Sequence, residues 1–354
     1  MRALLAGVFA LMTIAMTPLP PSPPPPPPPA PPIIIAHRGA SADRPEHTLA
    51  AYALAIEQGA DFIEPDLVPT KDHQLVARHE SEISETTNVA DHPEFASRKT
   101  TKTIDGETKT GWFTEDFTLA ELKTLRAKER LPQLRPANTK YDGQESIPTL
   151  DEIIALAKSG SASSGRAIGI YPETKHPSYF RSINLPLEPP LLAALAKAGW
   201  TTASAPVFIQ SFETGNLKAL KSQTGVRLIQ LIDSGTSADG VSYDSMITSA
   251  GLTAIAAYAA GIGPGRDRIL PRDAKGNLLP ATTLVRDAHA ARLQVHPWTA
   301  RPENYFLAAA YRRGANPVDR GDAAGEIRAY LETGIDGIFS DSTAAAVEAM
   351  SPAK

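Results

Sequence analysis

The stretch Ile33-Ile34-Ile35-Ala36-His37-Arg38-Gly39-Ala40 is an apolar run that ends abruptly in a charged pair and a glycine. A short apolar run bounded in this way is typical of a strand that is buried on both faces. Similar runs recur at Phe62–Leu67, Leu75–Arg78, Ile168–Glu173, Val207–Ser211, Arg227–Ile232, Ala260–Ile262, Gln294–Thr299 and Gly337–Ser340. Amphipathic helical patterns separate most of them, as at Thr48–Gln58, Leu150–Lys158, Leu191–Ala198 and Thr282–Arg292.

This alternation, repeated about eight times, predicts an α/β fold with a parallel sheet. At ~250 residues the usual outcome is a closed TIM barrel, (β/α)₈. The runs number one more than a barrel needs. Leu75–Arg78 follows Phe62–Leu67 after a polar turn that is too short for a parallel crossover, so we expect an antiparallel hairpin there. One strand is then either an irregular barrel member or an addition to the rim.

Residues 81–146 interrupt the alternation with a polar segment rich in Thr, Lys, Asp and Glu. A segment of this length inside a compact domain is more typical of an inserted subdomain than of a bare loop. A helical pattern at Thr118–Lys128 supports that interpretation. We therefore expect one barrel domain over residues 33–350 with a small inserted subdomain at 81–146.

Composition narrows the class of protein. The 354 residues are 42% hydrophobic, which suffices for a sizeable core and excludes wholesale disorder. A formal charge of −4 argues against nucleic-acid binding, which calls for a basic excess. The chain has no cysteine, so disulfides, zinc–thiolate sites and thiol catalysis are excluded.

The N-terminus resembles an export signal followed by a spacer. Arg2 precedes an apolar run over residues 3–16, which is too short for a stable membrane span, so we expect residues 1–17 to be a signal peptide. No clear cleavage site follows, and an uncleaved tether stays open. Residues 18–32 are mostly proline and predict a polyproline II linker, a spacer rather than a ligand for a proline-binding groove. The expected location is the periplasm or the medium.

Two histidines close apolar strand patterns. His37 and Arg38 stand at the carboxyl end of the first run, where barrels place their reactive groups. Histidine exchanges protons near neutral pH, and arginine offers a fixed fork for phosphate oxygens. His79 ends the run Leu75–Arg78 in the same way. A single histidine at such a position is more often structural, but a second instance in one chain strengthens the catalytic interpretation.

Carboxylates close two other runs. Glu64 and Asp66 are two residues apart on a strand and therefore share a face, which is costly inside a barrel unless a cation lies between them. Glu173 and Lys175 repeat this spacing and offer a third carboxylate and a cation for an anionic ligand; an exposed ion pair is the alternative. Trp298 provides either an apolar wall against an alcohol group or rim packing.

These motifs, in this order, resemble those of the glycerophosphodiester phosphodiesterase family, and its exported bacterial members in particular. The resemblance covers nearly all of residues 33–350. It rests on His37–Ser41, Pro45–Thr48, Glu64-x-Asp66, His79, Tyr171–Glu173 with Lys175, Tyr258–Pro264 and Val295–Pro297. The departures are His47 where many members have Asn, Pro65 between the carboxylates, and His73 in place of a common Gly.

The resemblance implies an irregular TIM barrel of the phospholipase C-like phosphodiesterase type and assigns roles to the residues. Its metal ligands map to Glu64, Asp66 and Glu173, and its acid and base map to His37 and His79. Its phosphate contacts map to Arg38 and Lys175. The implied cofactor is one divalent cation, with Ca²⁺ favoured by the resemblance and Mg²⁺ left open because carboxylates alone select only for hard ions.

The expected activity is metal-dependent hydrolysis of small glycerophosphodiesters, such as glycerophosphocholine or glycerophosphoethanolamine, to sn-glycerol 3-phosphate and an alcohol. One histidine would act as base and the other as acid, in an order that the sequence does not assign. The alternatives are a phospholipase C-like or D-like activity on intact lipids and a surface binding protein without turnover. A homodimer is left open.

Overall fold

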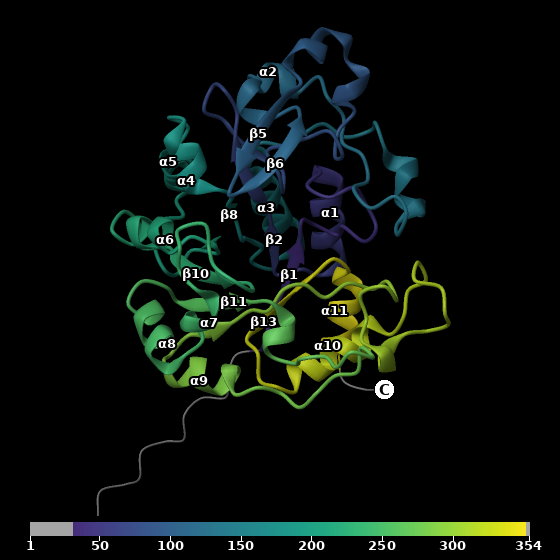
Figure 1. The fold of residues 1–354 in the computed structure, drawn as a ribbon, viewed down its shortest axis with the longest axis vertical. Helices are drawn as coiled ribbons and strands as arrows, with labels where there is room; N and C mark the ends of the chain where they lie inside the picture. Colours follow the sequence, from purple (N-terminus) through teal and green to yellow (C-terminus); the bar gives the residue numbers. More distant parts are fainter. Residues whose placement is uncertain (1–30, 352–354) are drawn as a thin grey trace, which may run out of the picture. The chain divides into compact units, whose positions relative to one another are not determined.

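The structure is a computed structural model that describes residues 31–351. The expected signal peptide and nearly all of the proline-rich linker lie outside the described residues. Within them, strands lie at the centre and helices lie around them (Figure 1). The strands are β1 Ile33–His37, β2 Phe62–Glu64, β3 Asp66–Pro69, β4 Leu75–Ala77, β5 Thr100–Ile104, β6 Glu107–Gly111, β7 Gly169–Ile170, β8 Glu173–Thr174, β9 Phe208–Ser211, β10 Arg227–Ile232, β11 Gly261–Pro264, β12 Gln294–Val295 and β13 Gly337–Ser340.

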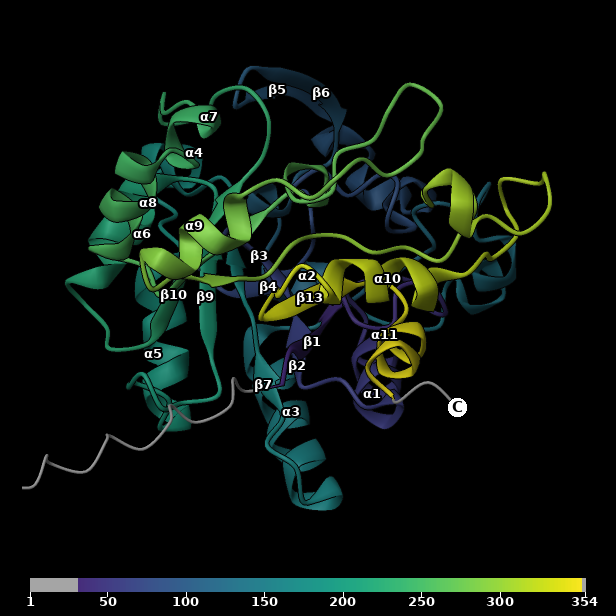
Figure 2. The same ribbon diagram turned by 90° about the horizontal axis from the view of Figure 1, so that it is seen from below.

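Helices follow most of the strands and cover the outside of the barrel. Figure 2 shows α5, α6, α8 and α9 on one side of the strands and α1, α10 and α11 on the other. No helix in the described part of the chain has the length and hydropathy needed to span a membrane. The α-helices are α1 Leu49–Gln58, α2 Leu119–Leu122, α3 Leu150–Ser164, α4 Pro177–Ser182, α5 Glu188–Ala198, α6 Thr214–Lys221, α7 Tyr243–Met246, α8 Ser249–Ala256, α9 Leu284–Ala290, α10 Ala323–Leu331 and α11 Thr343–Met350.

The central strands form a parallel TIM barrel, as predicted. One sheet has the order β13-β1-β2-β7, and the other has the order β12-β11-β10-β9-β8-β3-β4. β2 and β3 are two halves of one strand that is interrupted at Pro65, and β7 and β8 are divided in the same way. A parallel bridge from Ile170 to Val207 joins the sheets on one side, and a bridge from Ala300 to Ser340 joins them on the other.

The extra strand pattern is an addition to the rim. β4 pairs antiparallel with β3, with Val68 opposite Val76, which confirms the predicted hairpin. β1 pairs with β2 only as far as Glu64, and β4 lies beside β3 beyond that point. The strand therefore pairs with β1 before Pro65 and with β4 after it. Proline suits the position where the partner changes, because it has no N–H to donate to a neighbouring strand.

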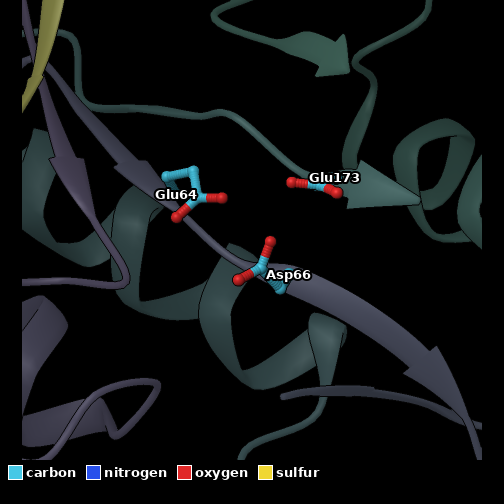
Figure 3. A group of neighbouring side chains, drawn as sticks. All are labelled: Glu64, Asp66 and Glu173. Atoms are coloured by element: carbon cyan, nitrogen blue, oxygen red, sulfur yellow. The ribbon is translucent and has the colours of Figure 1, made fainter. Parts of the chain in front are cut away.

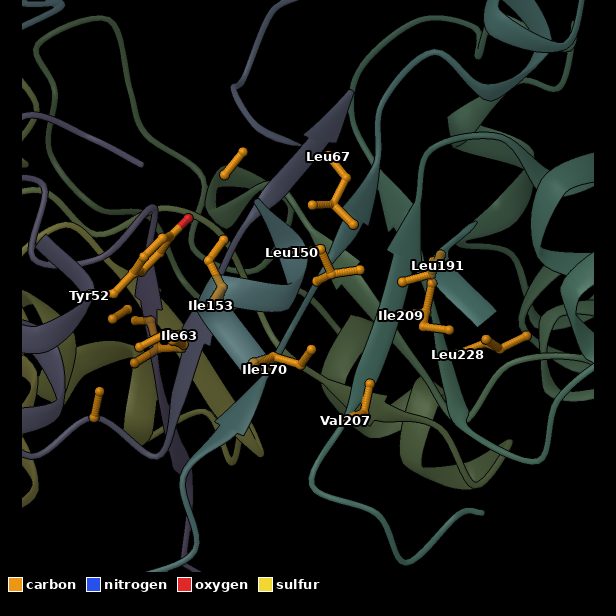
Figure 4. Close-up of a cluster of buried hydrophobic side chains, with 14 of the residues drawn as sticks. Tyr52, Ile63, Leu67, Leu150, Ile153, Ile170, Leu191, Val207, Ile209 and Leu228 are labelled. Atoms are coloured by element: carbon orange, nitrogen blue, oxygen red, sulfur yellow. The ribbon is translucent and has the colours of Figure 1, made fainter. Parts of the chain in front are cut away.

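Two apolar layers hold the barrel together. Between strands and helices, Ile63, Ile209 and Leu228 on the strands pack with Ile153 of α3 and Leu191 of α5 (Figure 4). The second layer lies inside the barrel and consists of Ile35, Phe62, Tyr171, Phe208, Ile229 and Phe339, which we call the interior layer. Full burial of each such side chain contributes ~1.5–3 kcal/mol.

The inserted segment contains the β5–β6 hairpin, α2 and short 3₁₀ turns. The predicted helix at Thr118–Lys128 is wrong in length, because α2 ends at Leu122. Its start is well specified, since Thr118 and Glu121 form a capping box. Beyond α2 the backbone pairs with other parts of the insertion: Ala127 bridges Thr87, and its N–H donates to the carbonyl of Glu145 at 2.8 Å. These long-range hydrogen bonds replace the helical ones.

Candidate active site

The strand periodicity places a polar layer directly above the interior layer. Residues two apart on a strand face the same way, so each interior apolar residue is followed by an inward-facing residue nearer the carboxyl end. At that end barrels carry their reactive groups. This polar layer consists of His37 on β1, Glu64 on β2, Glu173 on β8, Gln210 on β9 and Asp341 directly after β13.

Glu64, Asp66 and Glu173 form a buried carboxylate cluster (Figure 3). Each offers an oxygen that lies within 4.8 Å of the others, although Glu173 is more than 100 residues away in the chain. Glu64 and Asp66 are each 1% exposed, and Glu173 is 6% exposed. Burial and the neighbouring carboxylates raise the pKa of Glu64 well above its usual value. Burial likewise raises the pKa of Glu173 to about 8.

Hydrogen-bond donors orient Glu64 within this cluster. The backbone N–H of Arg38 donates to Glu64 Oε2 at 2.8 Å, and Gln210 Nε2 donates to Oε1 at 3.1 Å. Arg38 has φ of +60° and is followed by Gly39 at +86°, where a Cβ would lie 2.7 Å from the backbone of Ala51. The glycine thus allows the chain to pass close to α1 while the Arg38 N–H faces the carboxylate.

Separate partners hold the other two carboxylates. His47 Nε2 lies 2.9 Å from Asp66 Oδ2, and Lys175 Nζ lies 2.9 Å from Glu173 Oε1. Burial alone would raise the pKa of Asp66, but Lys175 and His47 hold it well below its usual value. Within the described residues, the buried Oε1 of Gln210 has no hydrogen-bond partner. Three buried carboxylates with an unsatisfied amide oxygen nearby fit a hard divalent cation such as Ca²⁺ or Mg²⁺.

His37 is held by a carboxylate from the far end of the chain. Its Nδ1 lies 2.6 Å from Asp341 Oδ1, and its Nε2 makes no hydrogen bond to any residue in 31–351. Burial, with a further contribution from Arg38, lowers the pKa of His37 to about 4. Asp341 is bound in turn by Arg135 and by Arg301. The ring is therefore neutral at pH 7 and presents one free nitrogen.

His79 has a similar arrangement at a more exposed position. Its Nδ1 lies 2.9 Å from Glu80 Oε1, and its side chain is 27% exposed. Burial, followed by the charges of Arg38 and Lys175, lowers the pKa of His79 to about 3. The backbone N–H of Arg78 donates to the carbonyl of Asp66 at 2.9 Å, so His79, the next residue, lies beside the carboxylate cluster. Both histidines thus use Nδ1 for a protein carboxylate and leave Nε2 available.

Arg38 and Lys175 are engaged by carboxylates. Arg38 Nη1 lies 3.0 Å from Glu46 Oε2, and its Nε lies 3.4 Å from Asp66 Oδ2. Lys175 is paired with Glu173 as described. The carboxylates raise the pKa of both cations despite burial, so both stay charged at neutral pH.

Trp298 belongs to an aromatic wall beside the cluster. Its Nε1 donates to the carbonyl of Gly263 at 2.8 Å, and its ring meets the edge of Phe212 at 5.8 Å between centroids. Lys175 Nζ lies 5.9 Å from the Phe212 ring. A cavity of about 660 Å³ is lined by Glu173, Lys175 and Phe212. Phe212 of the wall and Glu173 of the cluster therefore border the same cavity, and Trp298 lines a second cavity together with Arg301.

The roles of several residues of the site were not predicted from the sequence. His47 carries no strand-end signal, yet it contacts Asp66. Asp341 does close an apolar strand, which could have marked it as a partner for a catalytic group. Arg135 lies in the insertion, 206 positions from Asp341, and no local pattern indicates its contact with the site.

Fold and site together define a TIM-barrel protein with a buried cluster of three carboxylates, which could hold a metal ion, and two histidines beside it. A sequence model of the Glycerophosphoryl diester phosphodiesterase family matches residues 37–345. The chain belongs to this family and is a phosphodiester hydrolase.

Individual relatives support this family membership. Glycerophosphodiester phosphodiesterase GDPD6 of Arabidopsis thaliana is 38% identical over 325 residues, which are 87% of this chain and 83% of the relative. Glycerophosphodiester phosphodiesterase of Haemophilus influenzae is 30% identical over 77% of this chain and 79% of its own. A phosphodiesterase of Oleispira antarctica, solved in complex with the product sn-glycerol-3-phosphate, has a similar fold, with a TM-score of 0.60 at 21% identity over 90% of this chain and 97% of its own.

Proposed function

We propose that the protein hydrolyses small glycerophosphodiesters, such as glycerophosphocholine and glycerophosphoethanolamine, to sn-glycerol 3-phosphate and an alcohol. The observation that supports this most strongly is the carboxylate cluster Glu64, Asp66 and Glu173, with His37 and His79 at its rim. The family membership supports the class of reaction, and the polar, aromatic-walled cavity supports a small substrate.

Hydrolysis of a phosphodiester makes three demands: the phosphoryl oxygens need positive charge, the attacking oxygen must lose a proton, and the departing oxygen must gain one. A divalent cation held by Glu64, Asp66 and Glu173 would supply positive charge at the phosphoryl oxygens. Arg38 and Lys175 keep the surroundings of these carboxylates cationic. The diester is thereby held beside both histidines.

The histidines supply the proton transfers. The Nε2 of one histidine takes the proton from the attacking oxygen as the new phosphorus–oxygen bond forms. The Nε2 of the other gives a proton to the alcohol oxygen as its bond to phosphorus breaks. One ring must therefore be protonated in the substrate complex, and the negative charge of the bound diester favours that form. The attacker is either water or the neighbouring glycerol hydroxyl. Attack by the hydroxyl would first give a cyclic phosphate, which water would then open in a second step, with one histidine taking the proton of the water and the other returning a proton to the glycerol oxygen.

A direct assay tests the proposal. Purified protein is incubated with glycerophosphocholine, with chelator and then with Ca²⁺ or Mg²⁺ added back, and the release of sn-glycerol 3-phosphate is measured. Turnover that requires a cation supports the proposal, and the more effective ion identifies the cofactor. Release of diacylglycerol or phosphatidic acid from phosphatidylcholine, without turnover of glycerophosphocholine, would instead support the lipid-directed alternative.

We also propose that the protein is exported, on the basis of the apolar run over residues 3–16 that follows Arg2. Fusion of residues 1–40 to a reporter enzyme that is active only after export tests this. Activity of the fusion, and its loss when Leu4 and Leu5 are replaced by Asp, is the expected result. An inactive fusion that accumulates in the cytoplasm would contradict it.

A further inference from the structure

Arg135 connects the insertion to the polar layer of the barrel. Its side chain is only 3% exposed and contacts three distant segments. Nη1 donates to the carbonyl of Ser41 at 2.8 Å, and Nε donates to Glu303 Oε1 at 2.7 Å. Nη2 donates to Asp341 Oδ2 at 2.5 Å. All three acceptors are buried, so the guanidinium has one well-defined position.

The two oxygens of Asp341 are divided between two tasks. Oδ2 accepts from Arg135 and, at 3.2 Å, from Arg301 Nε, whereas Oδ1 faces His37 Nδ1. An ionised carboxylate can only accept, so a neutral His37 carries its proton on Nδ1 and keeps Nε2 unprotonated. The tautomer of His37 thus depends on the orientation and charge of Asp341.

We infer that Arg135 is a positioning residue of the reaction, which acts through Asp341 to hold His37 in the Nδ1-protonated tautomer. The inference rests on the proposed function only in that His37 acts on the diester. Arg135 itself touches neither the carboxylate cluster nor the rim cavities. The insertion is on this account part of the catalytic apparatus rather than a separate appendage.

The geometry of the site favours arginine over lysine at this position. Three acceptors on separate segments are met at once by the planar fork of a guanidinium, whereas a lysine ammonium is a point charge without that geometry. Burial alone would raise the pKa of Asp341, and Arg135 is foremost among the cations that hold it well below its usual value. Arg301 also binds Oδ2, but at a longer distance and with a more exposed side chain.

The test compares Arg135→Met and Arg135→Lys with wild type. Arg98→Met is the matched control, because Arg98 also lies in the insertion and pairs with a carboxylate, Glu121, away from the polar layer. Long-range ¹H–¹⁵N spectra of the histidine rings report the tautomer of His37, which is assigned with His37→Gln. Hydrolysis of glycerophosphocholine gives kcat and KM for each variant.

We expect Arg135→Met to convert His37 to a mixture of tautomers and to lower kcat by ~10–100-fold, a cost typical of lost positioning partners. KM should stay within about 2-fold of wild type, because Arg135 does not touch the substrate. Arg135→Lys should fall between, and Arg98→Met should match wild type. An unchanged tautomer or an unchanged kcat in Arg135→Met overturns the inference.

Two further variants keep the test decisive. Where Arg135→Met does not fold, the double variant Arg135→Met/Glu303→Gln removes one of the carboxylates left unpaired and is measured in its place. In an Asp341→Asn background, Arg135→Met should lower kcat by less than about 3-fold, since Asp341, through which Arg135 acts, is already altered. A loss of kcat as large as in the wild-type background contradicts the inference.

The tautomer measurement separates this inference from the proposed function. A wild-type protein that does not hydrolyse the diester would refute the proposed function, while the tautomer spectra would still decide whether Arg135 positions His37.

Discussion

The Nε2 atom of His47 lies 2.9 Å from Oδ2 of Asp66, and both side chains are buried. The other ring nitrogen of His47 lies 2.7 Å from the hydroxyl of Tyr52. Burial lowers the pKa of His47, so the ring is neutral at pH 7. With Nε2 protonated and Nδ1 accepting from Tyr52, the histidine donates to Asp66 and fixes the direction of its carboxylate within the cluster.

Replacement of His47 should therefore weaken cation binding. We expect His47→Ala to raise the Kd for Ca²⁺ or Mg²⁺ by ~10–100-fold, and His47→Asn, which keeps a donor, to have a smaller effect. Titration calorimetry on the folded variants measures both values. His73→Ala, at an exposed turn position, is the control. An Ala variant with wild-type affinity would show that Asp66 needs no such partner.

Cation binding should stabilise the fold, because the site exists only in the folded chain. At a concentration of 100 times Kd, the free energy of unfolding should rise by about 2.7 kcal/mol. Glu64→Gln and Glu173→Gln should abolish this gain, whereas Glu107→Gln on the exposed β5–β6 hairpin should keep it. Thermal unfolding with chelator and with added cation measures the difference. Equal stabilisation of Glu173→Gln and wild type would remove Glu173 from the site.

His296 should make the protein sensitive to acid. It is fully buried in contact with the interior layer, where its Nδ1 meets the Tyr171 hydroxyl at 2.8 Å, and burial lowers its pKa to about 4. Because the unfolded value is ~6.5, the contribution of His296 to stability is complete above pH 6.5 and is lost as the pH falls toward 4. Between pH 7 and pH 5 the loss should be about 2 kcal/mol.

His296→Gln should lack this part of the pH dependence. Urea unfolding at pH 7 and pH 5 gives the free energy of unfolding for the variant and for wild type, with His73→Gln as a control for an exposed histidine. The variant should lose about 2 kcal/mol less than wild type on acidification. Identical losses would mean that His296 titrates normally in the folded protein.

The aromatic wall should contribute to substrate binding. Trp298 packs against Phe212 beside the cavity that Lys175 lines. We expect Trp298→Ala to lower kcat/KM for glycerophosphocholine by about 10-fold, chiefly through KM, and Trp298→Phe to lower it less. Steady-state kinetics gives both constants. A loss confined to kcat would point to a positioning role and would contradict a wall that contacts the alcohol.

The strands were predictable where a short apolar run ends cleanly. Arg227–Ile232 and Gly337–Ser340 form β10 and β13 with the bounds that the sequence indicates. Phe62–Leu67 was predicted as one strand, but the structure divides it at Pro65, because the chain changes partners there. The helix predicted at Thr118–Lys128 is longer than α2, because tertiary pairing by residues such as Ala127 overrides the local helical preference.

The site was predictable to the extent that strand periodicity determines it. Glu64, Asp66 and Glu173 stand at strand ends, and the structure brings their carboxylates together. The residues whose roles were not predicted contact partners that are distant in the sequence. His47 and Arg135 lie in loops, where no strand or helix periodicity predicts that their side chains contact a carboxylate from another segment. Only the folded arrangement reveals what these two side chains orient.

The most direct test of the account follows the ³¹P NMR signal of glycerophosphocholine with chelated protein as one equivalent of Ca²⁺ or Mg²⁺ is returned. We predict no conversion to sn-glycerol 3-phosphate before addition, conversion after it, and none at any cation concentration for Glu64→Gln. Rapid conversion by chelated wild type, or by Glu64→Gln, would contradict the claim that this carboxylate cluster holds the cation on which hydrolysis depends.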